Sequence, residues 1–188
     1  MLPAMPTYSF MLSLGILAIL FSTLLSFSLY IFSEKVRKNL QGIEYFSYLR
    51  IIGLIAISST TFAMIYQLYY ELDVCILCWW QRIFIFPIDV IILVSLWKKI
   101  RWNHLITGIL SFGWLLFAGY HYYYHFLAWV LALPVVLPCE QGWLLPACTD
   151  NDGVLTFGFI TIPFMSLVVL LTMIWLSFLA SKAKWVDK

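Results

Sequence analysis

The sequence predicts an all-α integral membrane protein, and three observations support that fold class. Of the 188 residues, 63% are hydrophobic, 19% are aromatic and only 11% are charged, which is more apolar surface than one small soluble core can bury. The apolar residues gather in long stretches, each of the roughly 20 residues that a helix needs to cross the hydrocarbon core. These stretches lack the short alternating pattern of barrel strands, and a helix satisfies its own backbone polar groups in lipid.

Five stretches are predicted to form membrane-spanning helices. In chain order they cover residues 9–32, 51–70, 79–97, 105–126 and 157–180. The first is longer than the apolar core of a signal peptide and has no basic residue before it, so we expect a retained helix rather than a cleaved leader.

The Lys and Arg residues indicate the orientation, because basic residues beside the spans are retained on the cytoplasmic side. Ten of the eleven lie between spans one and two, between spans three and four, or after span five, and the eleventh is Arg82. The N-terminus and the loops 71–78 and 127–153 are therefore predicted to lie outside, with the C-terminal tail in the cytoplasm. All four cysteines fall in or beside these outer loops, which indicates thiol chemistry in an oxidising compartment.

Cys75 and Cys78 form a CxxC pair, and Arg82 follows four residues after the second cysteine. We expect Cys78 near the first turn of the third span, where exposed amides and the helix dipole favour an anion. Arg82 lies one turn further along the same face and adds a positive charge, so the pattern favours a thiolate at Cys78. Zinc binding, haem attachment and a structural disulfide are the alternatives. The second cysteine pair is spaced unlike a zinc ribbon, and Trp79 stands where a haem motif needs His.

The second pair, Cys139 and Cys148, lies in the later outer loop. A disulfide between them would close a short, proline-stiffened loop with little hydrophobic cover, and exposed disulfides tend to be exchangeable. Taken alone, a structural staple is an equally good interpretation. With a CxxC pair on the same membrane face, the two pairs could exchange electrons in series. The preceding apolar segment 127–138 is too short to span, so we expect it in the outer interface.

These motifs resemble the DsbB/BdbC family of membrane disulfide-bond formation proteins, and the BdbC-like branch most. The shared features are Cys75-x-x-Cys78-x-x-x-Arg82 at the mouth of a span, the later loop pair, and the run 158–164 that opens the last span. Vitamin K epoxide reductase relatives carry the redox CxxC after the loop pair, so the cysteine order argues against them. The resemblance covers about residues 50–180.

Two features depart from the family pattern. The first span is additional to the family's four-helix core, and the loop cysteines are closer together than in DsbB itself. We therefore expect residues 1–49 to hold an extra transmembrane helix and a cytoplasmic linker, and residues 50–188 to form a DsbB-like four-helix redox domain.

The resemblance implies a thiol oxidase of the bacterial cytoplasmic membrane that passes electrons to ubiquinone or menaquinone. Its partner would be a thioredoxin-fold oxidase similar to DsbA or BdbD, which would exchange with the Cys139–Cys148 pair through a mixed disulfide at Cys139. Cys148 would then attack Cys75 and free Cys78 to pass electrons to the quinone. All four cysteines are thus the expected catalytic residues, with no metal and no nucleic acid involved.

Arg82 and His121 are the expected quinone-binding residues. A quinone gains negative charge on oxygen as it is reduced, and a nearby guanidinium stabilises that charge, whereas His121 is assigned by the resemblance, with His125 as its alternate. An interfacial aromatic belt is the competing interpretation of both histidines. Asp89, deep in a span, is either a functional acid or a hydrogen-bond partner of a neighbouring helix. Gln67 is placed to bond a quinone or a tyrosine.

Other function classes stay open. A membrane reductase that passes electrons outward is chemically close, but cysteines within the spans would favour it. A structural subunit with inert disulfides is the second alternative. A transporter or channel needs several polar groups along a path through the helices, and here Asp89 is nearly alone.

Overall fold

The computed structural model describes residues 5–72, 74–100, 103–134 and 154–184. Its helices, in chain order, are α1 (Met5–Phe32), α2 (Glu34–Gln41), α3 (Tyr45–Leu68), α4 (Ile76–Lys98), α5 (Asn103–His125), the π-helical turn η1 (Phe126–Val130) and α6 (Ile162–Lys182). Within the described ranges, five helices are long and apolar enough to cross a membrane: α1, α3, α4, α5 continued by η1, and α6. The predicted all-α membrane fold is confirmed.

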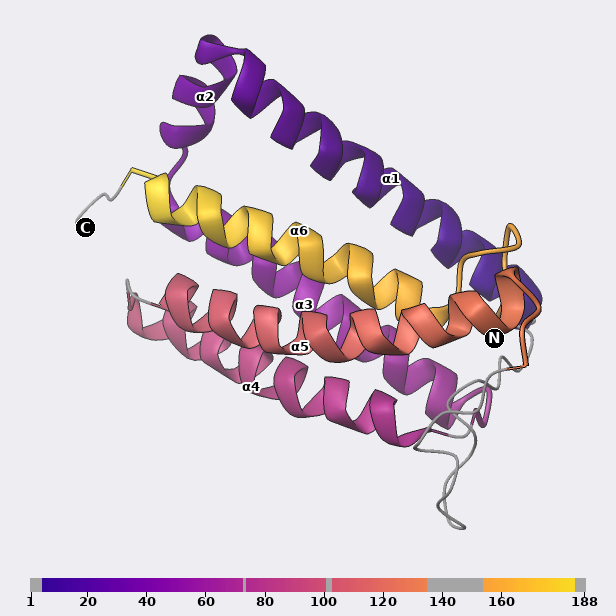
Figure 1. Cartoon of the computed structure of the whole chain (residues 1–188). Helices are drawn as coiled ribbons and strands as arrows, with labels where there is room; N and C mark the ends of the chain where they lie inside the picture. Colours follow the sequence, from indigo (N-terminus) through magenta and orange to yellow (C-terminus); the bar gives the residue numbers. More distant parts are fainter. Residues whose placement is uncertain (1–4, 73, 101–102, 135–153, 185–188) are drawn as a thin grey trace.

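Four of these helices form a closed bundle. α3 packs against α4, α4 against α5, α5 against α6, and α6 against α3, while α1 lies along the outer side of α6 (Figure 1). The core is centred on α6, where Leu170 and Met173 are fully buried. The two ends of the chain lie at opposite ends of the bundle (Figure 1), as an odd number of spans requires.

Two glycines set the position of α4, the helix that carries the CxxC pair. A Cβ atom on Gly53 of α3 would meet Ile92 Cγ2 at 2.8 Å, and one on Gly113 of α5 would meet Phe84 Cε1 at 2.7 Å. Small residues of this kind let membrane helices approach closely where hydrophobic forces between them are weak. α4 is therefore held tightly between α3 and α5.

The segment after α1, predicted to be a linker, contains a short helix that the sequence did not predict. α2 is a short, polar, surface helix, begun by Ser33, whose hydroxyl accepts a hydrogen bond from the Val36 N–H at 3.4 Å. An ion pair between Lys38 and Glu34 at 2.8 Å lies on its exposed side. The hydropathy pattern missed α2 because it is too short and too polar to resemble a span.

The last span begins later than the sequence predicted. α6 starts at Ile162 rather than at residue 157, because Phe157 and Gly158 take left-handed backbone conformations with φ of 52° and 76°. Thr156 and Ile160 close this turn through two backbone hydrogen bonds of 2.9 Å. Pro163 then occupies the first turn of α6, where its missing N–H costs nothing.

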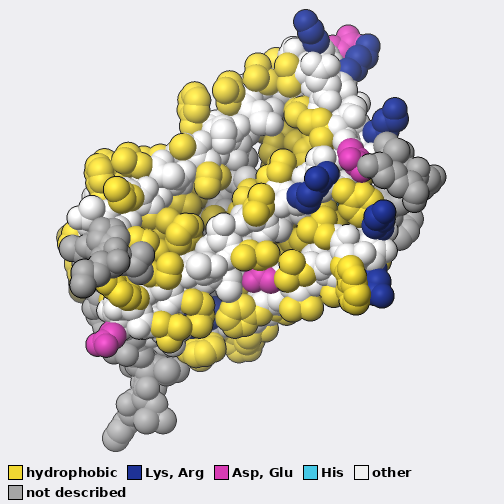
Figure 2. Space-filling view, turned by 180° about the vertical axis from the view of Figure 1, so that it is seen from behind, with side chains coloured by type: hydrophobic (Ala, Val, Ile, Leu, Met, Phe, Trp, Pro, Cys, Tyr) yellow, Lys and Arg dark blue, Asp and Glu magenta, His cyan; other side chains and the backbone are white. Residues whose placement is uncertain are grey.

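Charged side chains divide unevenly along the molecule. On the face seen in Figure 2, Lys and Arg gather at the end that holds α2, whereas hydrophobic side chains are spread over the rest of the face. This distribution matches the charge pattern from which the orientation was predicted.

Candidate functional site

The CxxC pair lies at the N-terminus of α4, and its two sulfurs have different surroundings. Cys75 is the N-cap residue and Cys78 lies in the first turn. The sulfurs are 3.4 Å apart, and the Cys78 backbone N–H donates to Cys75 Sγ at 3.4 Å. Cys75 is buried, whereas Cys78 is half-buried and lines a cavity. The predicted position of Cys78 in the first turn is confirmed, and its backbone N–H donates to the sulfur of Cys75.

Cys75 also faces a buried histidine that belongs to a hydrogen-bond network from three helices. His121 of α5 is 2% exposed, and its Nε2 lies 3.8 Å from Cys75 Sγ. The Gln81 side-chain nitrogen lies 3.1 Å from His121 Nδ1. The Gln81 oxygen accepts two hydrogen bonds, from the Trp114 indole at 3.3 Å and from the Ser166 hydroxyl at 2.8 Å.

The bonds of Gln81 determine where His121 carries its proton. An indole N–H can only donate, so the Gln81 atom that faces Trp114 must be the oxygen. The amide NH₂ group then faces His121 Nδ1, which must accept. Neutral His121 therefore carries its proton on Nε2, the nitrogen nearest to Cys75. This places a hydrogen-bond donor beside a sulfur that becomes negatively charged whenever it is released as a thiolate.

The same network opposes metal binding. Ligand atoms of Cys75, Cys78 and His121 lie within 4.8 Å of one another, which is a possible zinc ligand set. Ligation through His121 Nε2 would need the ring proton on Nδ1, donated to an acceptor. Gln81 instead presents its own N–H donors to Nδ1. The hydrogen bonds thus favour a thiol–imidazole pair over a metal centre.

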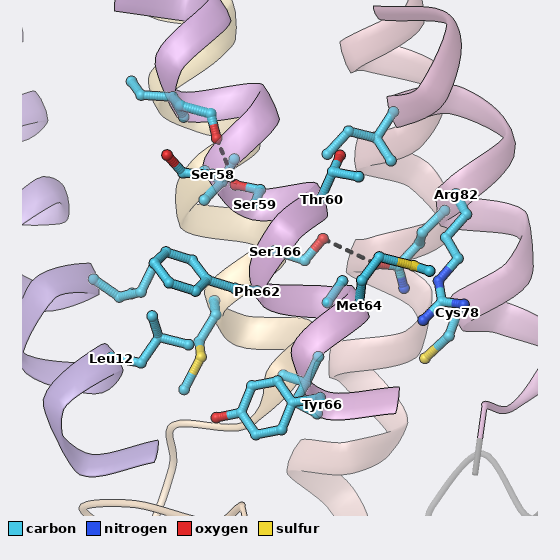
Figure 3. Close-up of a pocket in the computed structure, with 18 of the residues that line it drawn as sticks. Leu12, Ser58, Ser59, Thr60, Phe62, Met64, Tyr66, Cys78, Arg82 and Ser166 are labelled. Atoms are coloured by element: carbon cyan, nitrogen blue, oxygen red, sulfur yellow. Dashed lines mark hydrogen bonds between the residues drawn. The ribbon is translucent and has the colours of Figure 1, made fainter. Parts of the chain in front are cut away.

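Arg82 is fixed beside the second cysteine. Its side chain is only 8% exposed, and its Nη1 donates to Gln67 Oε1. The guanidinium carbon also lies 5.1 Å from the Trp79 ring centroid, within the range of a cation–π contact. Figure 3 shows the guanidinium next to the Cys78 sulfur. A permanent positive charge is therefore held at the same place as the cavity-facing thiol.

A cavity of about 780 Å³ extends from Cys78 and Arg82 between the helices. Its volume is within the roughly 300–1,000 Å³ usual for small-molecule sites. Its walls come from α1, α3, α4, α5 and α6, and they are mainly apolar. Arg82 is the charged residue among those lining it. The cavity therefore joins an apolar interior to one reactive, positively charged end.

Several side chains near this end do not line the cavity. His121 and His125 are both buried with their ring centroids 4.8 Å apart, and neither lines the cavity, so the structure brings Arg82 but not His121 to its wall. Trp79 and Trp80 are each 44% exposed and do not line it either. Cys139 and Cys148 lie outside the described residues.

Asp89 makes a hydrogen bond to a neighbouring helix, which was one of its two predicted roles. Its Oδ2 accepts a hydrogen bond of 2.7 Å from the Thr60 hydroxyl of α3. The predicted hydrogen bond to a neighbouring helix is thus confirmed, and Asp89 does not line the cavity.

Sequence reasoning missed the support around His121. Gln81, Trp114 and Ser166 come from three helices, and no spacing in the chain connects them. The available signal was Gln81 itself, because an amide inside a span needs hydrogen-bond partners.

The fold and this dithiol site together define a multi-pass helical membrane protein of the thiol oxidoreductase class. The family described as "Disulfide bond formation protein DsbB" matches residues 47–180, and the chain belongs to that family. It is similar to the SPbeta prophage-derived disulfide bond formation protein B of Bacillus subtilis (strain 168), with 32% identity over 122 residues, or 65% of this chain and 77% of that protein. No solved structure matches the chain at a significant level. The predicted family is confirmed, and α1 and α2 lie outside the matched region.

Proposed function

We propose that this protein is a quinone-linked thiol oxidase that reoxidises an extracytoplasmic thioredoxin-fold oxidase and so supports disulfide-bond formation. The observation that carries the proposal is that the two cysteines of the CxxC pair have different surroundings. Cys78 lines an apolar cavity beside the buried Arg82, whereas Cys75 faces the His121 imidazole. One sulfur is thus presented to an apolar electron acceptor, and the other is supported as a thiol-exchange group.

The cavity fits a quinone headgroup at its charged end. Gln67 and Arg82 supply polar groups there, and Cys78 supplies the thiol. A bound quinone, ubiquinone or menaquinone, accepts two electrons and two protons. Arg82 would stabilise negative charge on a quinone oxygen in a setting where water is largely excluded. Gln67 would act indirectly, because its oxygen holds the guanidinium in place.

Electrons would enter through the loop pair. The partner's dithiol would exchange with a Cys139–Cys148 disulfide, and that pair, now reduced, would exchange with Cys75–Cys78. In each exchange the donor dithiol loses two electrons and two protons to become a disulfide, and the acceptor disulfide becomes a dithiol. His121 Nε2–H would stabilise the Cys75 thiolate whenever that sulfur is the leaving group.

The charge pattern supports an orientation for this relay. Lys and Arg gather at the α2 end (Figure 2), which we assign to the cytoplasm, whereas Arg82 and Cys78 lie near the start of α4 (Figure 3), which we assign to the outside. We further assign residues 1–49 to an added unit and residues 50–188 to the redox domain. All four cysteines then lie on or beside the extracytoplasmic face of a bacterial cytoplasmic membrane.

The test mixes purified protein with a reduced thioredoxin-fold oxidase and either a ubiquinone or a menaquinone analogue, and follows quinone absorbance. We expect turnover with at least one quinone, abolished by Cys75→Ser and by Cys78→Ser. Unchanged turnover in both variants would instead support an inert structural subunit. No turnover with either quinone would overturn the proposal, and faster reduction of an oxidised partner by hydroquinone would support the outward reductase.

A further inference from the structure

α1 supplies one wall of the cavity, although it lies outside the family match. Six of its residues line the cavity, and their spacing places them on a single helical face. They are Tyr8, Met11, Leu12, Gly15, Ile16 and Ile19. The added helix therefore turns a continuous face toward the space that leads to Cys78 and Arg82.

Hydrogen bonds near both ends of α1 hold this wall against α3 and α6. Near the start of α1, the Tyr66 hydroxyl of α3 donates to Ser9 Oγ at 3.0 Å. Towards its other end, Thr23 bonds Thr172 of α6 at 3.0 Å. The Trp175 indole of α6 also donates to α1, at Ser26 Oγ over 3.2 Å. Most of the α1 wall therefore lies between a hydrogen bond to α3 and two hydrogen bonds to α6.

The cavity is long and opens at the apolar surface. On α3 its lining runs from Gln67 to Leu54, which is ~20 Å at about 1.5 Å per residue. Met11 and Leu54 line it and are 62% and 68% exposed, so the cavity reaches the apolar surface that faces lipid in a membrane. The cavity extends past α3, since its lining residues Cys78 and Arg82 lie on one side of this helix in Figure 3 and Leu12 and Phe62 lie on the other.

We propose that the α1 wall binds the polyprenyl tail of the quinone whose headgroup lies at Cys78 and Arg82. This inference rests on the proposed function. A ligand of this cavity needs a polar, reducible end at the arginine and the thiol, and a long apolar part along the mainly apolar walls. It also needs to enter from the lipid side, where exposed residues such as Met11 and Leu54 line the cavity. A quinone with an isoprenoid chain has all three properties.

Gly15 offers a way to fill the tail site without disturbing the helix. It lines the cavity, and a Cβ atom added there meets nothing within 4 Å. Replacing glycine inside a helix also improves helix propensity. Gly15→Phe would place a ring in the tail site, and Gly15→Leu would fill it partly. Gly119 is the matched control, because it also has open space around its Cβ position but lies on α5 and does not line the cavity.

The experiment compares decylubiquinone with the same headgroup lacking a tail, using both equilibrium binding and KM in the purified full-length protein. We expect Gly15→Phe to weaken the binding of decylubiquinone about tenfold, which is the effect of losing contact with about two methylene groups. The affinity for the tail-less quinone and the kcat should be unchanged. Gly15→Leu should have an intermediate affinity for decylubiquinone, and Gly119→Phe should have the wild-type affinity.

Two outcomes would overturn the tail site. One is an equal effect, or no effect, of Gly15→Phe on the two quinones. The other is loss of co-purified phospholipid from the variant with unchanged decylubiquinone affinity, which would assign the wall to a lipid acyl chain. Failure of the proposed function is distinguishable, because then the wild-type protein would reduce neither a ubiquinone nor a menaquinone analogue.

Discussion

The two ends of the cavity are built by different physical means. At the Cys78 end, the lining residues Gln81 and Arg82 have named hydrogen-bond partners, so the position of single atoms is specified. Along α1, the lining is mainly apolar, and only volume and shape are specified. Directional hydrogen bonds thus position the reactive groups, whereas an apolar surface holds the rest of the ligand. Polar substitutions at the first end should therefore have larger effects than volume changes at the second.

Arg82→Ala should cause the largest loss within the polar end outside the cysteines. Removing a donor that stabilises developing negative charge lowers kcat by about 100-fold or more. Arg82→Lys should recover part of the rate, because it keeps the charge but loses the planar guanidinium that bonds Gln67. The measurement is quinone reduction at saturating partner, with binding measured separately.

Lys98→Ala is the matched control for Arg82. Lys98 also packs on an aromatic ring, with its Nζ 4.2 Å from the Trp97 centroid, but it lies at the other end of α4. Turnover should not change in this variant. Full turnover and full quinone affinity in Arg82→Ala would show that the arginine does not act on the quinone. The two ends of the cavity would then not differ in the way argued above.

Gln81→Leu should have the next largest effect, because Gln81 positions His121 rather than touching the sulfur. Without the amide, His121 Nδ1 loses the donor that keeps the ring proton on Nε2. Thiol exchange at Cys75 should slow about tenfold, the size expected for a hydrogen bond to a charged group. Nitrogen NMR of labelled histidine should show the Nε2–H form in the wild type and a mixture in the variant.

The tautomer signal separates positioning from a general structural defect. Gln41→Leu is the control, since Gln41 bonds the Tyr30 hydroxyl at 3.1 Å far from the cysteines, and it should leave both the exchange rate and the histidine spectrum unchanged. An Nε2–H signal that persists in Gln81→Leu, together with slower exchange, would show that Gln81 acts by packing alone.

Much of the membrane architecture could be predicted from the sequence, because hydropathy depends on composition within one segment. Each of the five predicted spans overlaps an observed helix. The start of α6 was misplaced since backbone turns such as Phe157–Gly158 depend on φ values that hydropathy does not contain. α2 was missed for a related reason, because a short polar helix forms from capping and charge pairs rather than from apolar residues.

The candidate site was predictable where its residues are neighbours in the chain. Cys75, Cys78 and Arg82 fall on successive turns of one helix, so their proximity follows from spacing. The Gln81 partners Trp114 and Ser166 are brought together only when three helices pack. The wall made by α1 was unpredictable in the same way, because the family pattern does not contain that helix.

Asp89→Asn should have the smallest effect, and it tests whether the chemistry is confined to the polar end. An intramembrane acid is a functional candidate by default, yet Asp89 lies off the cavity and bonds Thr60 between α3 and α4. Asparagine keeps an oxygen that accepts from the Thr60 hydroxyl, so turnover should equal that of the wild type. Stability should change by no more than about 0.6 kcal/mol, the average for hydrogen bonds between membrane helices.

Thr60→Val provides the comparison for Asp89→Asn, because it removes the same bond while keeping the carboxylate. If the bond only joins α3 to α4, Thr60→Val should lower the melting temperature at least as much as Asp89→Asn does, and kcat should stay unchanged in both. A large fall in quinone reduction in Asp89→Asn alone would show that the carboxylate takes part in proton uptake. The chemistry would then extend along the bundle, and the division between a reactive end and an apolar end would no longer hold.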